Sequence, residues 1–216
     1  MITGAKGGLG SFVTEAFLAA GARVAGVSRS IQDSDFSHPD FIAVPAELSS
    51  GEAARNVVSR VVERLGRVDI LVHVMGGFAG GQSVAETDDA TFEKMLDLNY
   101  RAAFYMARAV LPPMRAQGNG RILAVASRQA IEPAAMVGAY SASKAALVSL
   151  IRTIALENKD RSIAANTVLP GTMDTPGNPG AQFVKPAQVA AMLVHLASDA
   201  AAQVTGAAIP IYGAQV

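Results

Sequence analysis

A tyrosine and a lysine stand four residues apart in the segment Ala139–Lys144, and their spacing has a direct chemical consequence. On a helix, positions i and i+4 share one face, so Tyr140 and Lys144 would lie side by side. A neighbouring ammonium group stabilises a phenolate and lowers the phenol pKa toward the working range of a general acid or base. The alternative is a half-buried tyrosine beside a solvated lysine, because such pairs also arise by chance.

A serine follows the apolar run Ile122–Val125, which is expected to be a strand. At the carboxyl end of that strand, the Ser127 hydroxyl would be placed to hydrogen-bond a substrate carbonyl and the charge that develops on it. The alternative for Ser127 is a simple turn-forming role. Taken together, the serine, the tyrosine and the lysine predict proton transfer at a carbonyl or alcohol.

The chain opens on a glycine-rich turn, TGAKGGLG over residues 3–10, directly before a segment with helical character. Glycines there allow the backbone to turn sharply and to approach a pyrophosphate, whose charge meets free N–H groups at the helix N-terminus. The Gly-x3-Gly-x-Gly spacing differs from the usual Gly-x-Gly-x-x-Gly, and a turn needed only for packing is the alternative. The position before a helix favours nucleotide binding.

The end of the second expected strand bears on the choice of nucleotide. An acidic residue at this point would bind the adenosine ribose hydroxyls and favour NAD. The sequence has Ser28 and Arg29 instead, and a hydroxyl beside a guanidinium suits a 2′-phosphate. Lys6 adds a positive charge nearby. NADP(H) is therefore favoured over NAD(H), against the alternative that Arg29 is a solvated loop residue.

The composition excludes several other kinds of chemistry. The 216 residues include no cysteine and three scattered histidines, so no disulfide framework, cysteine nucleophile or metal site is expected. Eighteen basic and eighteen acidic residues leave no net charge, which argues against nucleic-acid binding. No run approaches ~18 apolar residues and no signal peptide is evident, so we expect no membrane segment and a cytoplasmic location.

The segments that must position these residues alternate between short apolar runs and longer helical stretches. The expected strands are Arg23–Val27, Phe41–Val44, Ile70–Val74, Ile122–Val125, Ile163–Val168 and Ala207–Ile211. The expected helices are Leu9–Ala20, Glu52–Leu65, Asp89–Met114, Tyr140–Glu157 and Pro186–Ser198. This alternation predicts a single doubly wound, three-layer α/β domain over residues 1–216, with a parallel sheet and with ligands at the carboxyl ends of its strands.

Local signals set some of the expected helix ends. The Ser49-x-x-Glu52 spacing predicts a capping box, and Gly66 should end the helix that it begins. Pro112 and Pro113 should break the long middle stretch near its end, and Pro186 should open the last helix.

Together these residues resemble the short-chain dehydrogenase/reductase family, and the resemblance covers nearly the whole chain. The family's Thr-Gly-x3-Gly-x-Gly turn is matched by Thr3, Gly4, Gly8 and Gly10, and its Tyr-x3-Lys pair by Tyr140 and Lys144. Its serine, thirteen residues before the tyrosine, falls on Ser127, and its helix asparagine on Asn99. Its Pro-Gly motif and the threonine that follows fall on Pro170, Gly171 and Thr175.

The resemblance implies an NAD(P)-binding Rossmann domain in which nicotinamide exchanges a hydride with a carbonyl carbon. In that reading Tyr140 transfers the hydroxyl proton, Lys144 holds the nicotinamide ribose and keeps the Tyr140 pKa low, Ser127 orients the carbonyl, and Asn99 supports a water of the proton relay. The expected cofactor-binding residues are Gly4, Lys6, Gly8, Leu9, Gly10, Ser28, Arg29, Glu47, Leu48, Gly76, Tyr140, Lys144, Pro170, Gly171 and Thr175. A homodimer or homotetramer is also implied, through Asp89–Met114 and Tyr140–Glu157, although these helices are alternatively just deeply packed.

The sequence departs from the family pattern after the fourth strand, where His73-Val74-Met75-Gly76 replaces Asn-Asn-Ala-Gly. His73 is either a partly buried histidine with a local hydrogen bond or a titrating group near the nicotinamide. The stretch Gly76–Gly81, with Asp174-Thr175-Pro176-x-Asn178, resembles dihydropteridine reductase, a branch of the same family that reduces quinonoid pterins. Pterin reduction is therefore an alternative function, and a non-catalytic nucleotide-binding scaffold is another.

The chain is short at two places compared with family members of roughly 250 residues. Met1-Ile2 is barely a strand, and the cover between Pro170 and Pro186 is reduced and too rich in glycine and proline for a long helix. Either the protein is a minimal member or the sequence lacks pieces at those points. The substrate, a small carbonyl or alcohol, depends on this cover and on the Ser127–Gly138 loop.

Overall fold

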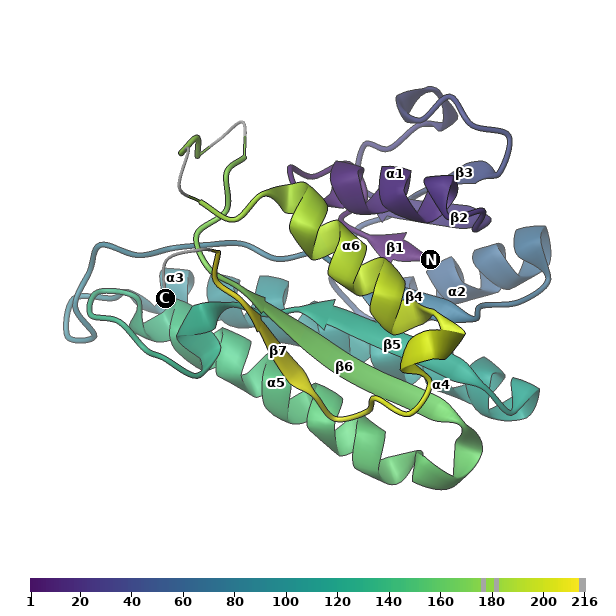
Figure 1. Ribbon diagram of the computed structural model, residues 1–216. Coiled ribbons are helices and arrows are strands. Elements are labelled where there is room, and N and C mark those ends of the chain that lie inside the picture. The colour runs from purple at the N-terminus through teal and green to yellow at the C-terminus, as the bar shows by residue number, and fades with distance from the viewer. Residues whose placement is uncertain (176–177, 181–182, 214–216) are drawn as a thin grey trace.

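The computed structural model of this protein describes residues 1–175, 178–180 and 183–213. In this part of the chain, seven parallel strands form one sheet in the order β3-β2-β1-β4-β5-β6-β7 (Figure 1). Their bounds are β1 Ile2–Thr3, β2 Val24–Ser28, β3 Phe41–Pro45, β4 Ile70–His73, β5 Gly120–Val125, β6 Ile163–Pro170 and β7 Ala208–Ile211. The predicted α/β class and strands are confirmed, and the strand order reverses between β1 and β4, where such sheets bind ligands.

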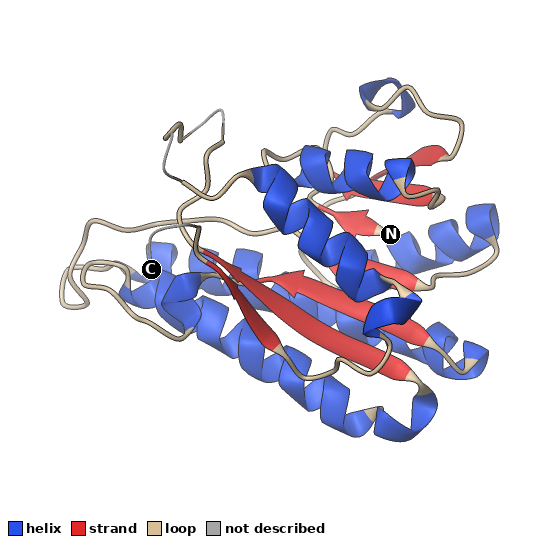
Figure 2. Ribbon diagram, viewed as in Figure 1, coloured by secondary structure: helices blue, strands red, loops and turns tan. Residues whose placement is uncertain are grey.

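Helices cover both faces of the sheet, as Figure 2 shows. They are α1 Gly10–Ala19, α2 Gly51–Leu65, α3 Asp89–Leu96, α4 Ala102–Gln117, α5 Gly138–Glu157 and α6 Pro186–Ala197. One core lies under α1 and α6 and includes Phe17 and Leu193, and the other lies under α2, α4 and α5 and includes Met106 and Leu147. This is the predicted three-layer arrangement. Among the described helices, none combines the length and the apolar character needed to cross a lipid bilayer.

The start of α2 corrects one sequence prediction. Ser50, not Ser49, caps the helix, because its hydroxyl oxygen accepts a hydrogen bond of 3.1 Å from the Ala53 backbone N–H. The helix therefore begins one residue earlier than Glu52, and the predicted capping box does not form. Gly66 ends α2 with φ of 85°, and Pro186 opens α6, both as predicted.

The long middle stretch is interrupted at a different place from the predicted one. α4 continues through Pro112 and Pro113 to Gln117, so the prediction of a break there was wrong. Val110 and Met114 are fully buried on either side of the prolines, and this packing offsets the hydrogen bonds that proline cannot make. The interruption lies instead at a π-helical turn over Asp97–Arg101, a type of distortion that is frequent at functional sites.

Candidate active site

The carboxyl ends of β1, β2 and β4 meet the first turns of α1 and α5 around a cavity of about 1300 Å³. The glycine turn and Arg29 line one part of this cavity, and Tyr140 and Lys144 line another. All the expected cofactor-binding residues line it except Pro170, Gly171 and Thr175. Gly171 lies at a second cavity of about 430 Å³, and Pro170 is the buried last residue of β6.

In the glycine turn, packing requires glycine at positions 4 and 10 but not at position 8. A Cβ on Gly10 would lie 1.9 Å from the Gly4 carbonyl oxygen, and Gly4 itself has φ of +69°. A Cβ on Gly8 would meet only the Thr175 side chain, at 3.6 Å. Packing therefore explains Gly4 and Gly10, whereas Gly8 faces space where a ligand can approach, with Thr175 beside it.

The N-terminus of α1 opens on the cavity, where Leu9 and Gly10 line the wall. Leu9 occupies the N-cap position without a side-chain hydrogen bond to the helix, and the first turn contains no acidic residue. The first N–H groups of such a helix carry partial positive charge and suit a phosphate. A pyrophosphate group therefore fits this end of the cavity.

Of the two basic residues near the glycine turn, Lys6 is paired with an acidic residue and Arg29 is not. Lys6 forms an ion pair of 2.8 Å with Asp35, and its ammonium also donates to the Ser30 carbonyl oxygen at 3.2 Å. The ion pair lowers the pKa of Asp35 below its ordinary value. Ser28 accepts a hydrogen bond of 3.3 Å from the Lys6 backbone N–H. Arg29 is exposed on the cavity wall and forms no ion pair within the described part of the chain.

Tyr140 and Lys144 lie one turn apart near the start of α5, as their spacing predicts. The Lys144 ammonium is buried and donates a hydrogen bond of 2.9 Å to the Val125 carbonyl oxygen at the end of β5. Burial lowers the pKa of Lys144 to about 8. Burial raises the pKa of Tyr140, and a hydrogen bond with the Ser127 hydroxyl lowers it by a smaller amount. The expected lowering of the Tyr140 pKa by Lys144 is therefore wrong for this structure, because desolvation of the phenol dominates.

Ser127 is buried directly after β5, at the start of the short 3-10 turn Arg128–Ala130. Its hydroxyl donates a hydrogen bond of 2.5 Å to the side-chain oxygen of Gln129. The sequence analysis missed Gln129, because no motif marks it. A serine hydroxyl has a single proton, so Gln129 and a substrate carbonyl would compete for it.

Asn99 is fully buried in the π-helical turn. Its side-chain oxygen accepts from the Gly77 N–H at 2.9 Å, and its amide nitrogen donates to the Gly77 carbonyl at 3.0 Å and to the Ser143 hydroxyl at 3.1 Å. A Cβ on Gly76 would lie 2.7 Å from the Asn99 side-chain oxygen and 3.0 Å from the Lys144 nitrogen. Asn99 thus fastens the chain after β4 beside Lys144, a role that its position in the sequence did not reveal.

His73 ends β4 beneath this site and is buried. Its Nδ1 lies 2.9 Å from the Thr3 hydroxyl, and burial, with a smaller contribution from the Lys144 charge, lowers its pKa to about 3. The histidine is therefore neutral over the physiological range. The local hydrogen bond of the first interpretation is confirmed, although the side chain is fully rather than partly buried, and the lowered pKa argues against a titrating group near the nicotinamide.

Comparison with known proteins decides the family. Residues 1–182 match the family described as short chain dehydrogenase. The chain belongs to the short-chain dehydrogenase/reductase family. It is therefore an NAD(P)-dependent dehydrogenase or reductase, and its fold is the one that this family uses.

Individual relatives of this short-chain dehydrogenase cover almost its full length. It is 27% identical over 252 residues to D-beta-hydroxybutyrate dehydrogenase of Rhizobium meliloti, covering 99% of this chain and 96% of the relative. It is 29% identical over 238 residues to the 3-oxoacyl-[acyl-carrier-protein] reductase FabG of Thermotoga maritima, with coverage of 100% and 96%. The crystal structure of 3-ketoacyl-(acyl-carrier-protein) reductase from Brucella melitensis, complexed with NADH, superimposes with a TM-score of 0.93 at 26% identity, covering 99% and 96%.

The structure describes only part of the two segments that resemble dihydropteridine reductase. Gly76–Gly81 forms an irregular segment after β4, and Gly77 is held by Asn99. In the second motif, Thr175 and Asn178 form an isolated bridge, whereas residues 176–177, which include Pro176, lie outside the described residues.

Proposed function

We propose that this protein is an NADP(H)-dependent oxidoreductase that transfers a hydride between nicotinamide and a carbonyl or secondary alcohol, with Tyr140 as general acid and base. The observation that carries the proposal is one continuous cavity that joins two kinds of site. Its first part has a glycine turn, an uncapped helix N-terminus and Arg29, and its second part has Tyr140 and Lys144. Nucleotide binding and proton transfer therefore meet in the same space.

The residues present fit a dinucleotide. Gly8 is free of packing constraints, the first turn of α1 offers N–H donors to phosphate, and Glu47 and Leu48 line the cavity farther along its wall. When bound, the nicotinamide supplies or accepts the hydride. The protein contributes position and electrostatic field.

Each catalytic residue then either transfers a proton or donates a hydrogen bond. In reduction, Tyr140 donates its phenolic proton to the carbonyl oxygen as the carbonyl carbon receives the hydride, which gives the alcohol and a phenolate. Ser127 donates to the same oxygen after its hydroxyl leaves Gln129. The buried Lys144 would bind the nicotinamide ribose hydroxyls through its ammonium group. Asn99 holds Gly77 in place through two hydrogen bonds and thereby shapes the floor beside Gly76 and Lys144.

The preference for NADP(H) rests on charge. Arg29 is the exposed cation on the cavity wall at the end of β2, and its guanidinium suits a 2′-phosphate. Lys6 contributes less, because Asp35 already neutralises much of its charge. The absence of an acidic residue at positions 28 and 29 removes the usual partner of the NAD ribose.

The same proposal includes a homodimer or homotetramer in the cytoplasm. Phe92 on α3 and Leu156 on α5 are exposed apolar side chains that a helix-to-helix interface would cover. The cysteine-free composition suits a reducing compartment. Sedimentation analysis tests the oligomer, and a monomer at micromolar concentration would contradict it.

Nicotinamide absorbance with a panel of ketones, aldehydes and acyl thioesters tests the activity. Tyr140→Phe should lower turnover by a factor of about 10² to 10⁴, the usual contribution of general acid–base catalysis, while cofactor binding persists. Intact turnover in this variant would refute the mechanism. Turnover of a quinonoid dihydropterin that is insensitive to Ser127→Ala would point to pterin reduction. Failure of both nucleotides to raise the melting temperature would point to a scaffold.

A further inference from the structure

Four large apolar side chains stand exposed on two loops that flank Tyr140. Phe78 and Val84 lie between β4 and α3, and Ile131 and Met136 lie between β5 and α5. Phe78 is 68% exposed and Val84 is 81% exposed. We call these four residues the apolar rim. Exposed apolar side chains that are grouped in this way commonly mark a binding surface.

The two loops of the apolar rim are fastened to one another. The Gly81 N–H donates a hydrogen bond of 2.8 Å to the Met136 carbonyl oxygen. A Cβ on Gly80 would lie 2.8 Å from a Val137 methyl group and 2.9 Å from the tip of the Phe78 ring. Met136 also adopts φ of 65°, an uncommon conformation that persists when its surroundings hold it in place. These contacts join the two loops around Phe78 and Met136.

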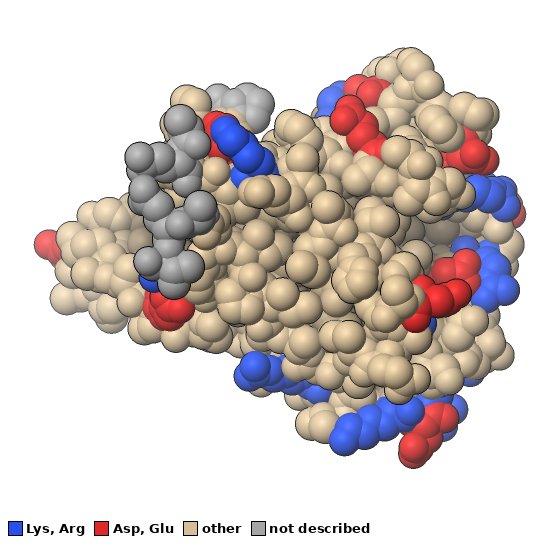
Figure 3. All heavy atoms as spheres, viewed as in Figure 1, with Lys and Arg blue, Asp and Glu red and all other residues tan. Residues whose placement is uncertain are grey.

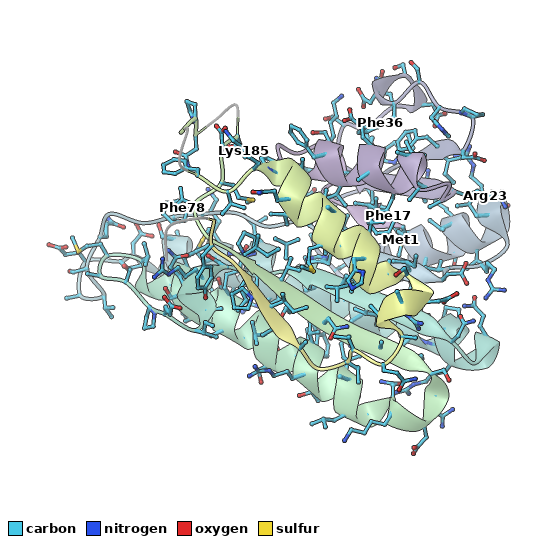
Figure 4. All side chains as sticks on the ribbon, viewed as in Figure 1. Met1, Phe17, Arg23, Phe36, Phe78 and Lys185 are labelled. Carbon is cyan, nitrogen blue, oxygen red and sulfur yellow. The ribbon has the colours of Figure 1, made fainter. Side chains whose placement is uncertain are left out.

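The apolar rim reaches the reacting phenol. The rings of Phe78 and Tyr140 meet edge to face, with centroids 5.0 Å apart and an interplanar angle of 73°. Both residues line the large cavity, and Figure 4 shows Phe78 at the carboxyl end of the sheet. A carbonyl bound by Tyr140 would thus carry one of its substituents directly onto Phe78.

The two loops that carry the apolar rim offer no unpaired cation to a substrate. Residues 74–85 include no charged side chain, and the Glu86 carboxylate accepts a hydrogen bond of 2.8 Å from the Ser83 hydroxyl. On the other loop, Glu132 pairs with Arg128 at 2.6 Å, and the Arg128 guanidinium lies 4.8 Å from the centre of the Tyr212 ring. On the face shown in Figure 3, most of the visible atoms at the left end of the molecule are uncharged, with an acidic side chain at the tip. A carboxylate or phosphate on the substrate would find Arg128 already neutralised.

We infer that the substrate is an uncharged ketone or secondary alcohol with a ring or a branched apolar group next to the reacting carbon, and that Phe78 binds that group. The inference rests on the proposed oxidoreductase function and specifies its substrate class. It disfavours short keto acids and acyl groups on charged carriers. Aromatic faces bind planar apolar groups well, and the edge contact with Tyr140 leaves a face of Phe78 available.

The test compares three methyl ketones in the intact protein with its nicotinamide cofactor: acetophenone, butanone and acetoacetate. We expect the highest kcat/KM with acetophenone and the lowest with acetoacetate. Phe78→Ala should raise the KM for acetophenone about tenfold and leave that for butanone nearly unchanged. Phe78→Tyr should retain the KM for acetophenone, because it keeps the ring. Phe12→Ala, which truncates an exposed phenylalanine of α1 outside the cavity, is the matched control and should change neither value.

The outcomes separate the two proposals. Efficient reduction of acetoacetate, or a Phe78→Ala variant that affects both neutral ketones equally, would overturn the substrate class while the oxidoreductase function stands. No turnover of any ketone, aldehyde or acyl thioester in the wider panel would overturn the proposed carbonyl reaction itself. If Phe78→Ala does not fold, the ranking of the three ketones by the unmodified protein and the Phe78→Tyr result still decide the inference.

Discussion

Replacing Asn99 should loosen the candidate active site through hydrogen bonds that it makes to the backbone. Its side chain satisfies both the N–H and the carbonyl of Gly77, at 2.9 and 3.0 Å, and donates to Ser143 at 3.1 Å. Asn99→Ala leaves these groups without that partner. The segment that they hold lies against Lys144, so the variant should lose both stability and activity.

The magnitude follows from the two backbone groups of Gly77. A fully buried polar group left without a partner costs about 1–3 kcal/mol, and the two Gly77 groups are partly buried, so Asn99→Ala should lower the free energy of unfolding by roughly 2–4 kcal/mol. For a chain of this size, 1 kcal/mol corresponds to about 2–4 °C in the melting temperature. A loss of about 3 kcal/mol therefore predicts a melting temperature lower by roughly 6–12 °C.

Asn99→Asp provides a pH-dependent version of the same experiment. Ionised aspartate presents oxygen where the Gly77 carbonyl needs a donor, so its pKa in the folded state should rise above the ordinary ~3.9. A raised pKa in the folded state means that the protein is more stable relative to the unfolded chain at low pH and loses this advantage as the pH rises through the folded-state pKa. Asn99→Asp should therefore be closest to wild type in acid, whereas the deficit of Asn99→Ala should not follow this trend.

The assay measures calorimetric unfolding of both variants from acidic to neutral pH, together with kcat per folded molecule. Asn158→Ala is the matched control, since Asn158 is an equally buried asparagine at the opposite end of α5 that bonds to Ile154 and Arg115. The control should lose stability but keep its kcat. An Asn99→Ala variant with an unchanged melting temperature, or one whose kcat loss Asn158→Ala reproduces, would refute the reasoning.

Three further predictions follow from burial, backbone contact and charge. Burial lowers the pKa of Lys144 to about 8 from an ordinary 10.5, so stability should rise as the pH increases across that interval, and Lys144→Met should flatten this rise in a calorimetric pH series. Gly10→Ala should fail to fold, because its Cβ would lie 1.9 Å from a backbone oxygen, whereas Gly8→Ala should fold and bind nucleotide more weakly in a titration. Arg29→Ala should raise the KM for NADPH and not that for NADH, and Asp35→Asn should lower the KM for NADPH by releasing Lys6; equal effects on both nucleotides would contradict the proposed preference.

Several features of the fold were predictable because their signals are local. The strands Phe41–Pro45 and Ile70–His73 are continuous apolar runs, and the helical spacing of Tyr140 and Lys144 depends only on 3.6-residue periodicity. Helix ends were less predictable. Ser49 and Ser50 offer the same cap chemistry, and the choice between them depends on where the helix meets its neighbours. At Pro112 and Pro113, burial of the flanking side chains outweighed the local preference.

The sequence alone determined the residue types that can carry the chemistry and their places in local elements, with Ser127 after a strand and Tyr140 and Lys144 one turn apart on a helix, because these follow from neighbours along the chain. Only the tertiary structure decided what each group faces. Lys144 donates to Val125, Asn99 to Gly77 and Ser143, and each contact joins segments about twenty or more residues apart. Burial, not spacing, set the direction of the Tyr140 pKa. Desolvation and long-range hydrogen bonds depend on how the elements pack, and no pattern within a single element records them.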